Sequence, residues 1–286
     1  MSSTIPVYSE QESFHKDFYQ DYNISSYRDE PQEDLNRTEA HRHTYYEIIW
    51  IKKGSGKHFI DFKNYPFEGP CLFILNPGVV HKIEKDGPTE GYVAKFSDSF
   101  LTQIEANSVQ IIKNGLFDDI HPRPVFRLNK QQISILDELM QKMLAEFNRN
   151  EEFSRSILVS YLKIFLLRIY ELRENEDHTR FNSPRYKVLF DFKNLIEAHF
   201  CQEHEIGFYT EKLATSHRNL NHITSEFTGK SAKALINQRL LLEAKRLLYS
   251  SRNIKETAYA IGFNDPAYFS RFFKRHEGQS PSSFLK

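Results

Sequence analysis

Apolar and polar residues follow two different periods along this chain. Between Tyr45 and His81 the sequence is rich in aromatic and β-branched residues and is interrupted by turn residues at short intervals. Short strands at such spacing are typical of a β-sandwich or β-barrel. Strands are predicted at Tyr45–Ile51, Lys57–Phe62 and Cys71–Leu75, and turns at Gly54-Ser-Gly56, Pro66, Gly69-Pro70 and Asn76-Pro-Gly78.

A helical period replaces this pattern after Leu128. Asn129 can cap a helix that runs to about Phe147, and a second helix is predicted from Ser154 to Leu172. The polar run that follows has no apolar periodicity and is predicted to be an interdomain linker. The pattern therefore predicts an N-terminal domain over residues 1–172 with a helical hairpin at 129–172, a linker at 173–183 and a C-terminal domain over 184–286.

The C-terminal third contains a degenerate internal repeat. Leu220–Ser231 aligns with Phe269–Ser280, 49 residues later, and each copy reaches a glycine after nine steps. Ser216 and Asp265 are predicted helix N-caps, and the glycines are predicted C-caps. Each copy follows a short predicted helix, at Phe208–Leu213 or at Asn253–Ile261, so the helix-turn-helix unit occurs twice. A helix of about 27 Å over Ala232–Tyr249 is predicted to join the two units.

The two longer helices of the repeat have one apolar face and one polar face. The predicted buried stripes are Leu220, Ile223 and Phe227 in the first copy and Phe269, Phe272 and Phe273 in the second. The opposite faces carry arginine, asparagine, serine and small residues, which are the types that read base edges in the major groove. The candidate DNA-binding residues are His217, Arg218, Asn221, His222, Ser225, Ala267, Ser270, Arg271, Lys274 and Arg275.

The charge distribution supports a polyanion-binding C-terminal domain. The 286 residues have 38 basic and 38 acidic side chains, but residues 184–286 hold 16 basic and 10 acidic ones. The amino terminus has no signal-peptide pattern, and no apolar stretch is long enough to span a membrane. Two cysteines without a Cys-x-x-Cys motif make a disulfide scaffold or thiolate zinc site improbable. These features predict a cytoplasmic protein that does not associate with membranes.

The C-terminal region resembles the DNA-binding domain of AraC/XylS-type transcription regulators. The resemblance covers Arg185–Lys286 and is carried by Ala258-Tyr-Ala-Ile-Gly-Phe-Asn-Asp-Pro-Ala-Tyr-Phe-Ser-Arg-Phe-Phe-Lys274 and by Gly278-Gln-Ser-Pro281. The first unit departs from the family pattern, because Thr224-Ser-Glu226 stands where the family often has Phe-Lys-Lys. Glu226 would repel phosphate if it faced the DNA backbone. The resemblance implies promoter DNA and RNA polymerase as partners, with activation the commoner outcome.

The N-terminal region contains His41-Arg-His43-Thr-Tyr-Tyr-Glu47 and Pro77-Gly-Val-Val-His81, which have the spacing of the two cupin motifs. In metal-binding cupins the three histidines and the glutamate converge on one metal. The resemblance also extends to the sensor domains of AraC/XylS-type regulators, in which these elements commonly persist without a catalytic metal and the barrel binds a small effector. We therefore expect an effector pocket, without metal, cofactor or catalytic residues. Its expected lining residues are His41, His43, Tyr45, Glu47 and His81.

The sequence thus predicts an α+β protein. Its N-terminal part is a cupin-like β-barrel with a helical hairpin, and its C-terminal part is an all-α domain with two helix-turn-helix units joined by a linker helix. The predicted function is sequence-specific transcription regulation in response to an unknown small-molecule effector, with dimerisation through 129–172 as a further expectation.

Three alternatives remain at this stage. One alternative is a metal-dependent cupin enzyme with a helical accessory domain. Another is a protein-interaction scaffold whose Arg271-bearing face contacts protein. In the first case His41, His43, Glu47 and His81 are the expected metal ligands. Otherwise His41 is exposed, and His43, Glu47 and His81 are hydrogen-bonded barrel residues. Residues 1–25, with Phe14, Phe18, Tyr19 and Tyr22, form either an arm over the barrel mouth or a packed edge.

Overall fold

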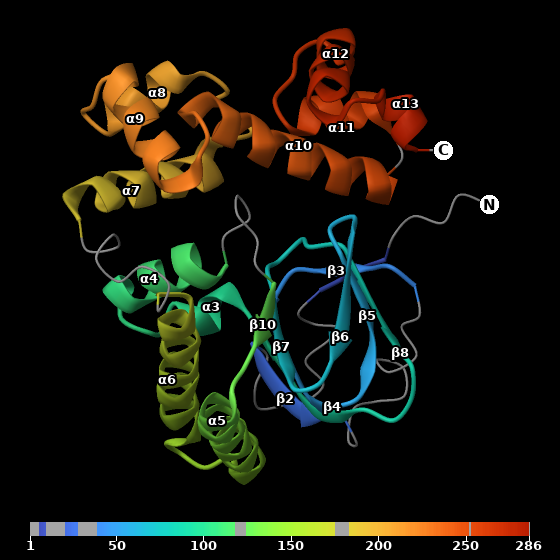
Figure 1. Cartoon of the computed structure of the whole chain (residues 1–286), viewed down its shortest axis with the longest axis vertical. Helices are drawn as coiled ribbons and strands as arrows, with labels where there is room; N and C mark the ends of the chain where they lie inside the picture. The colour runs from blue at the N-terminus through green and yellow to red at the C-terminus, as the bar shows by residue number, and fades with distance from the viewer. Residues whose placement is uncertain are drawn as a thin grey trace. The chain divides into compact units, whose positions relative to one another are not determined.

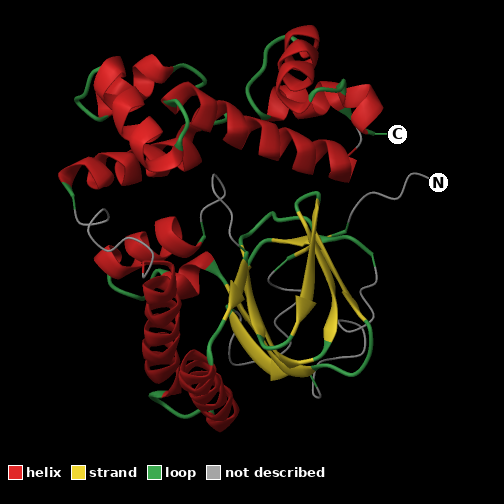
Figure 2. Ribbon diagram, viewed as in Figure 1, coloured by secondary structure: helices red, strands yellow, loops and turns green. Residues whose placement is uncertain are grey.

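The protein was analysed as a computed structural model, which describes residues 6–9, 21–27, 39–117, 124–174, 183–251 and 253–285. The chain divides into two compact units, of which one spans Pro6–Arg173 and the other includes Glu174–Lys286. The first unit combines strands with helices, and the described part of the second contains helices alone (Figures 1 and 2). The predicted α+β class is confirmed.

Two facing sheets form the β part of the first unit. The five-stranded sheet has the order β10-β7-β4-β9-β2, the three-stranded sheet has the order β6-β5-β8, and β1 pairs in parallel with β3. The strand pairings of the described residues do not close these sheets into one continuous barrel, so the predicted barrel is an open, cupin-like one. The strands are β1 (Val7–Tyr8), β2 (Tyr22–Ser26), β3 (Arg42–His43), β4 (Tyr46–Lys53), β5 (Ser55–Ile60), β6 (Lys63–Glu68), β7 (Cys71–Leu75), β8 (His81–Lys85), β9 (Glu90–Phe96) and β10 (Val125–Arg127).

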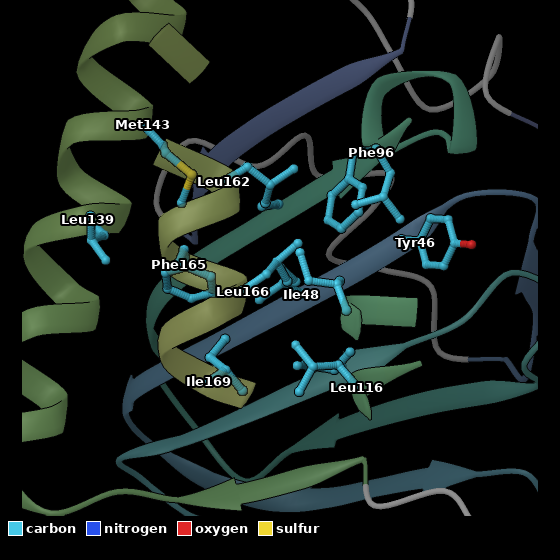
Figure 3. Close-up of a cluster of buried hydrophobic side chains, with 14 of the residues drawn as sticks. Tyr46, Ile48, Phe96, Leu116, Leu139, Met143, Leu162, Phe165, Leu166 and Ile169 are labelled. Carbon is cyan, nitrogen blue, oxygen red and sulfur yellow. The ribbon is translucent and has the colours of Figure 1, made fainter. Parts of the chain in front are cut away.

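The five-stranded sheet is buried on both faces. Its inner face packs against the smaller sheet through Ile49, Phe73 and Val93, among others. Its outer face is covered by helices, as Figure 3 shows for Ile48, Phe165 and their neighbours. These helices are α3 (Asp98–Leu101), α4 (Ala106–Leu116), α5 (Lys130–Arg149) and α6 (Ser154–Glu174). The predicted helical hairpin, α5 and α6, is therefore part of the first unit's core, because apolar strands need a second layer to exclude water.

Most expected elements of the first unit are present, with two corrections: Ser55 and Gly56, expected in a turn, belong to β5, and Pro66 lies within β6. Asn129 caps α5 with a capping box to Gln132, as predicted for this position. Pro66 is wrongly predicted as a turn, since it lies within β6 opposite Lys57. Of the amino-terminal aromatics, Tyr22 is fully buried in β2, which favours the packed edge at that residue. Phe14, Phe18 and Tyr19 lie outside the described residues.

The second unit has the predicted helical organisation. Ser183, Ser216 and Asp265 accept hydrogen bonds from backbone N–H groups at the starts of α7, α9 and α12, and Gly229 and Gly278 end α9 and α12 in the left-handed conformation. Such residues encode helix ends locally, which explains why the sequence predicts these boundaries well. The helices are α7 (Pro184–His199), α8 (Ile206–Lys212), α9 (His217–Thr228), α10 (Ala232–Ser251), α11 (Ile254–Ala260), α12 (Pro266–Glu277) and α13 (Pro281–Phe284).

Candidate functional site

The predicted buried and exposed faces of α9 and α12 are largely confirmed. Leu220, Ile223, Phe269 and Phe273 are buried, whereas Phe227 and Phe272 are only half-buried. Thr224 is fully buried beside Ile223 in the first copy. On the opposite faces, Asn221 and Ser270 are half-buried, and the other eight candidate DNA-binding residues are exposed: His217, Arg218, His222, Ser225, Ala267, Arg271, Lys274 and Arg275.

Two of these candidates have roles within the fold. The Asn221 side-chain oxygen accepts a hydrogen bond from the Ala232 N–H at 2.9 Å and so caps the start of α10. The Ser270 hydroxyl donates to the Pro266 carbonyl of its own helix at 2.8 Å. Each residue therefore has less hydrogen-bonding capacity left for an external ligand than the sequence alone indicates.

The arginines differ in their surroundings. Arg271 lies 3.9 Å from the Asp265 carboxylate with 69% of its side chain exposed, a distance at which an exposed ion pair contributes little. Glu226 in the divergent first unit pairs with Arg185 of α7 at 2.9 Å. This ion pair offsets the negative charge of Glu226 on α9.

In the first unit, the expected effector-pocket residues converge between the two sheets. All five are buried: His41, His43, Tyr45, Glu47 and His81. The Glu47 Oε2 atom lies 3.6 Å from His43 Nε2 and 3.7 Å from His81 Nε2. Backbone hydrogen bonds from His41 to His81 and from Gly78 to His43 hold the two cupin-like motifs together.

His41 and Tyr45 lie beside the group formed by His43, Glu47 and His81 rather than within it. The His41 ring packs against the His81 ring with centroids 4.3 Å apart. The Tyr45 ring stacks on His43 at 4.2 Å, and its backbone carbonyl accepts a hydrogen bond from His43 Nδ1 at 2.6 Å. The tight group of possible ligand atoms therefore consists of His43, Glu47 and His81.

Two further polar residues face the same interior and were not expected from the sequence. His58 on β5 is fully buried, and its Nε2 lies 3.1 Å from His81 Nδ1. Lys95 on β9 is 5% exposed and lies opposite Glu47 in the strand register. Strand alternation was the available signal, because His58 shares a face with Ile60, and Lys95 shares one with Val93.

The electrostatics of these side chains follow from their burial and from their contacts with one another. Burial alone would raise the pKa of the Glu47 carboxyl, but the contact with His43 and the charges of His43, Lys95 and His41 outweigh it and lower the pKa to about 2. Burial lowers the pKa of His58 to about 3, so this ring is neutral at physiological pH. This buried group of side chains therefore contains an ionised carboxylate among imidazoles.

Sequence relatives exist for both units. Residues 23–162 match the family described as AraC-like ligand binding domain, and residues 209–286 match the helix-turn-helix domain family. The HTH-type transcriptional activator RhaS of Escherichia coli is 26% identical over 247 residues, which cover 84% of this chain and 85% of RhaS. No helix within the described residues is both long and apolar enough to span a bilayer.

Solved structures also match this chain, with TM-scores below 0.5. ToxT from Vibrio cholerae, solved with a bound unsaturated fatty acid, has a TM-score of 0.44 and 18% identity and covers 94% of this chain and 96% of its own. The C-terminal domain of AraT, a response regulator from Geobacillus stearothermophilus, has a TM-score of 0.33 and 27% identity, covering 36% of this chain and 84% of that domain.

Proposed function

The chain belongs to the AraC-type transcription regulators, with an N-terminal ligand-binding domain and a C-terminal helix-turn-helix domain, and from this premise we propose how its residues perform regulation. The DNA-binding part is residues 184–286, and the sensor part is residues 1–172. The single observation that carries the proposal is the pair of N-capped helices, α9 and α12, with polar faces exposed to solvent.

In this proposal, α9 and α12 enter successive major grooves on one side of the promoter DNA. The linker helix α10 supports this spacing, since its 20 residues extend about 30 Å, close to the roughly 34 Å of one DNA turn. Arg218 and Arg271 read base edges, because both are exposed and an arginine donates two hydrogen bonds to guanine. Lys274 and Arg275, in the last turn of α12, bind phosphates.

The remaining candidates have supporting roles in the interface. His217, His222, Ser225 and Ala267 line the faces around the arginines and are exposed. Asn221 and Ser270 keep only part of their hydrogen-bonding capacity, as their contacts with Ala232 and Pro266 use the rest. We expect them to contribute less to sequence discrimination than the arginines.

The effector binds in the sensor unit, between the two sheets. The pocket residues are His41, His43, Tyr45, Glu47 and His81, to which the structure adds His58 and Lys95 as lining candidates. A buried carboxylate, imidazoles and an ammonium favour a small polar ligand over a purely apolar one. The protein is a regulator rather than a catalyst in this proposal.

Other features of the proposal concern partners. The α5–α6 hairpin leaves large apolar side chains exposed, with Phe153 at 67%, Ile164 at 44% and Ile135 at 38%, and we propose that it forms a homodimer contact. RhaS is named an activator, and we propose activation here too, through contact with RNA polymerase in the cytoplasm.

The test selects binding sites from random-sequence DNA with the full chain and with single variants. Arg218→Ala and Arg271→Ala should each relax preference at one base position, about one helical turn apart, at a cost of about 1–3 kcal/mol, or roughly 5- to 150-fold in affinity. Lys274→Ala is the matched control, and it should weaken all sequences similarly. If both arginine variants keep the parental preference while affinity falls uniformly, neither arginine reads sequence.

A further inference from the structure

The two helix-turn-helix units contact each other directly as well as through the linker helix α10. Residues 200–205 lie directly before α8 of the first unit, and residues 261–265 form the turn between α11 and α12 of the second. Gly262 in this turn lies so close to the first segment that a Cβ on it would be 1.8 Å from the Cys201 carbonyl oxygen. The two segments are therefore in backbone contact, although they lie far apart in the sequence.

His204 makes the polar part of this contact. Its Nε2 atom lies 2.9 Å from the Ile261 carbonyl oxygen. A carbonyl oxygen only accepts hydrogen bonds, so the imidazole donates through Nε2. Ile261 is the C-cap of α11, and the carbonyl groups at the end of a helix have no partner within that helix. A side chain next to α8 of the first unit therefore caps a helix of the second unit.

The His204 ring also packs on the aromatic side chain against which α12 rests. Its centroid lies 4.8 Å from that of Phe263, whose side chain is buried. The Phe263 ring contacts three rings of α12, with centroids 5.7, 5.5 and 5.1 Å away: Tyr268, Phe269 and Phe272. A movement of His204 relative to Phe263 is therefore a movement of the first unit relative to the second recognition helix.

The backbone of His204 is attached to the linker helix. Lys233, in the first turn of α10, donates a hydrogen bond through Nζ to the His204 carbonyl at 2.6 Å. The same ammonium pairs with the Glu205 carboxylate at 2.9 Å. His204 is therefore bound to α10 through its backbone and to the second unit through its side chain.

Other contacts attach each recognition helix to α10. Asn221 of α9 caps the start of α10 through the Ala232 N–H. Lys245 of α10 pairs at 3.0 Å with Glu277, the last residue of α12. These two contacts place α9 and α12 on α10 but do not join the two units to each other. The contact of His204 with Ile261 and Phe263 adds a direct connection between the units.

We infer that His204 is a positioning residue that fixes the two helix-turn-helix units in one relative arrangement and thereby sets the half-site spacing that the chain accepts. The inference rests on the proposed function, in which α9 and α12 enter successive major grooves. One added base pair moves the second half-site by about 3.4 Å along the duplex and by about 35° around it. Two helices fixed to each other cannot follow that displacement, whereas two units released at His204 follow part of it.

The strength of the His204 contact limits the size of the effect. One hydrogen bond and one ring contact together shift an equilibrium between two arrangements by about 5- to 150-fold. Discrimination between the correct and the altered spacing should fall by a factor in this range when both contacts are removed. The side chains that contact bases and phosphates remain in place, so binding to the correct spacing is retained.

The first measurement uses the free full chain. Spin labels are carried by noncanonical residues at two exposed positions, Ser225 on α9 and Lys274 on α12, and pulsed electron paramagnetic resonance gives the distribution of distances between them. His204→Ala should broaden this distribution. His204→Gln should keep it narrow, because the glutamine Nε2 can still donate to the Ile261 carbonyl. Gln202→Ala, an exposed position in the same segment, is the matched control.

The second measurement uses the DNA site that the parent selects from random sequences. Mobility shift compares this site with versions in which one base pair is added or removed between the half-sites. The parent and Gln202→Ala should bind the altered sites much more weakly than the selected one, and for His204→Ala this loss should be about 5- to 150-fold smaller. A merely structural role of His204 would weaken binding to all three DNAs alike and leave their ratio unchanged.

The outcomes separate this inference from the proposed function. The inference is overturned if His204→Ala keeps the parental distance distribution, or if it keeps the parental ratio of affinities among the three DNAs. Where the parent selects no site with two half-sites, the proposed function fails, and the distance distribution still decides whether His204 fixes the units. Circular dichroism identifies a variant that does not fold. His204→Phe, which keeps a ring against Phe263 and loses the donor, then replaces His204→Ala in both measurements.

Discussion

Asp137 on α5 joins the helical hairpin to the outer face of β4, and its removal should destabilise the sensor unit. Its Oδ1 accepts a hydrogen bond from the Trp50 indole N–H at 3.3 Å. Its Oδ2 accepts from Lys52 Nζ at 2.8 Å and from Gln141 Nε2 at 2.9 Å. Trp50 is fully buried, whereas 33% of the Lys52 side chain is exposed.

The expected cost of Asp137→Ala follows from these exposures. An indole N–H left buried without an acceptor costs about 1–3 kcal/mol. The loss of the partly exposed pair with Lys52 adds about 0–1 kcal/mol after solvent screening. The free energy of unfolding should therefore fall by about 1–4 kcal/mol, which lowers the melting temperature of a unit of this size by about 2–16 °C.

The assay is chemical denaturation followed by tryptophan fluorescence. Trp50 is the single tryptophan of the chain, so its emission reports on the sensor unit alone. Asp137→Asn keeps an acceptor for the indole and loses only the charge, and it should cost less than about 1 kcal/mol. Glu138 is the exposed sequence neighbour of Asp137, and Glu138→Ala is therefore the surface control. The reasoning is refuted if Asp137→Ala unfolds like the parent, or if Asp137→Asn costs as much as Asp137→Ala.

Two other regions give further predictions. A Cβ at Gly262 (φ +83°) would lie 1.8 Å from the Cys201 carbonyl oxygen, whereas one at Gly278 (φ +85°) would meet nothing within 4 Å. Gly262→Ala should therefore lower the free energy of unfolding of the helical unit by about 2–5 kcal/mol, and Gly278→Ala should lower it by about 1–2 kcal/mol. The measurement is chemical denaturation followed by circular dichroism, and equal losses for the two variants would contradict this reasoning. Burial raises the pKa of the Cys71 thiol to about 12, so at pH 8 its thiolate should be about 1000-fold scarcer than in the unfolded chain. Mass spectrometry after alkylation should show Cys201 modified well before Cys71, and similar rates would contradict the buried environment.

How far the sequence predicted the molecule depends on whether the determining contacts are local. Ser216, Asp265 and Gly278 lie at the helix ends that they cap, so the helical unit could be predicted closely. Strand β2 could not be predicted in the same way, because its residue Tyr22 pairs with Phe96, more than 70 residues away. The apolar pattern of β2 alone does not identify that partner. Proline lacks a backbone N–H, so the sequence predicts a turn at Pro66, yet β6 is an edge strand, where a missing donor is tolerated.

The same distinction applies to the candidate sites. The resemblance to the cupin motifs implies that His41, His43, Glu47 and His81 converge, and the structure groups the last three while His41 packs beside His81. His58 could not be recognised as part of this group, since only the pairing of β5 with β8 brings it to His81. The second role of Asn221, as the cap of α10, was likewise hidden, because a polar residue on an outward face gives no sign of a backbone contact 11 positions later.

Strand β4 links the two halves of the sensor unit through its alternating side chains. Glu47, Ile49 and Ile51 lie on the inner face of the sheet, and Ile48 and Trp50 pack with the helices on the outer face. A ligand changes the DNA affinity of a regulator only if it binds two conformations of the protein with different affinity. A ligand that draws Glu47 toward the histidines must move the β4 backbone or strain it. Because interiors are close-packed, we expect such a movement to be transmitted to the α5–α6 hairpin, which contacts β4 through the Trp50–Asp137 hydrogen bond. A sensor that used Tyr45 or His41 alone would lack this connection, since neither residue lies on a strand whose opposite face carries the hairpin.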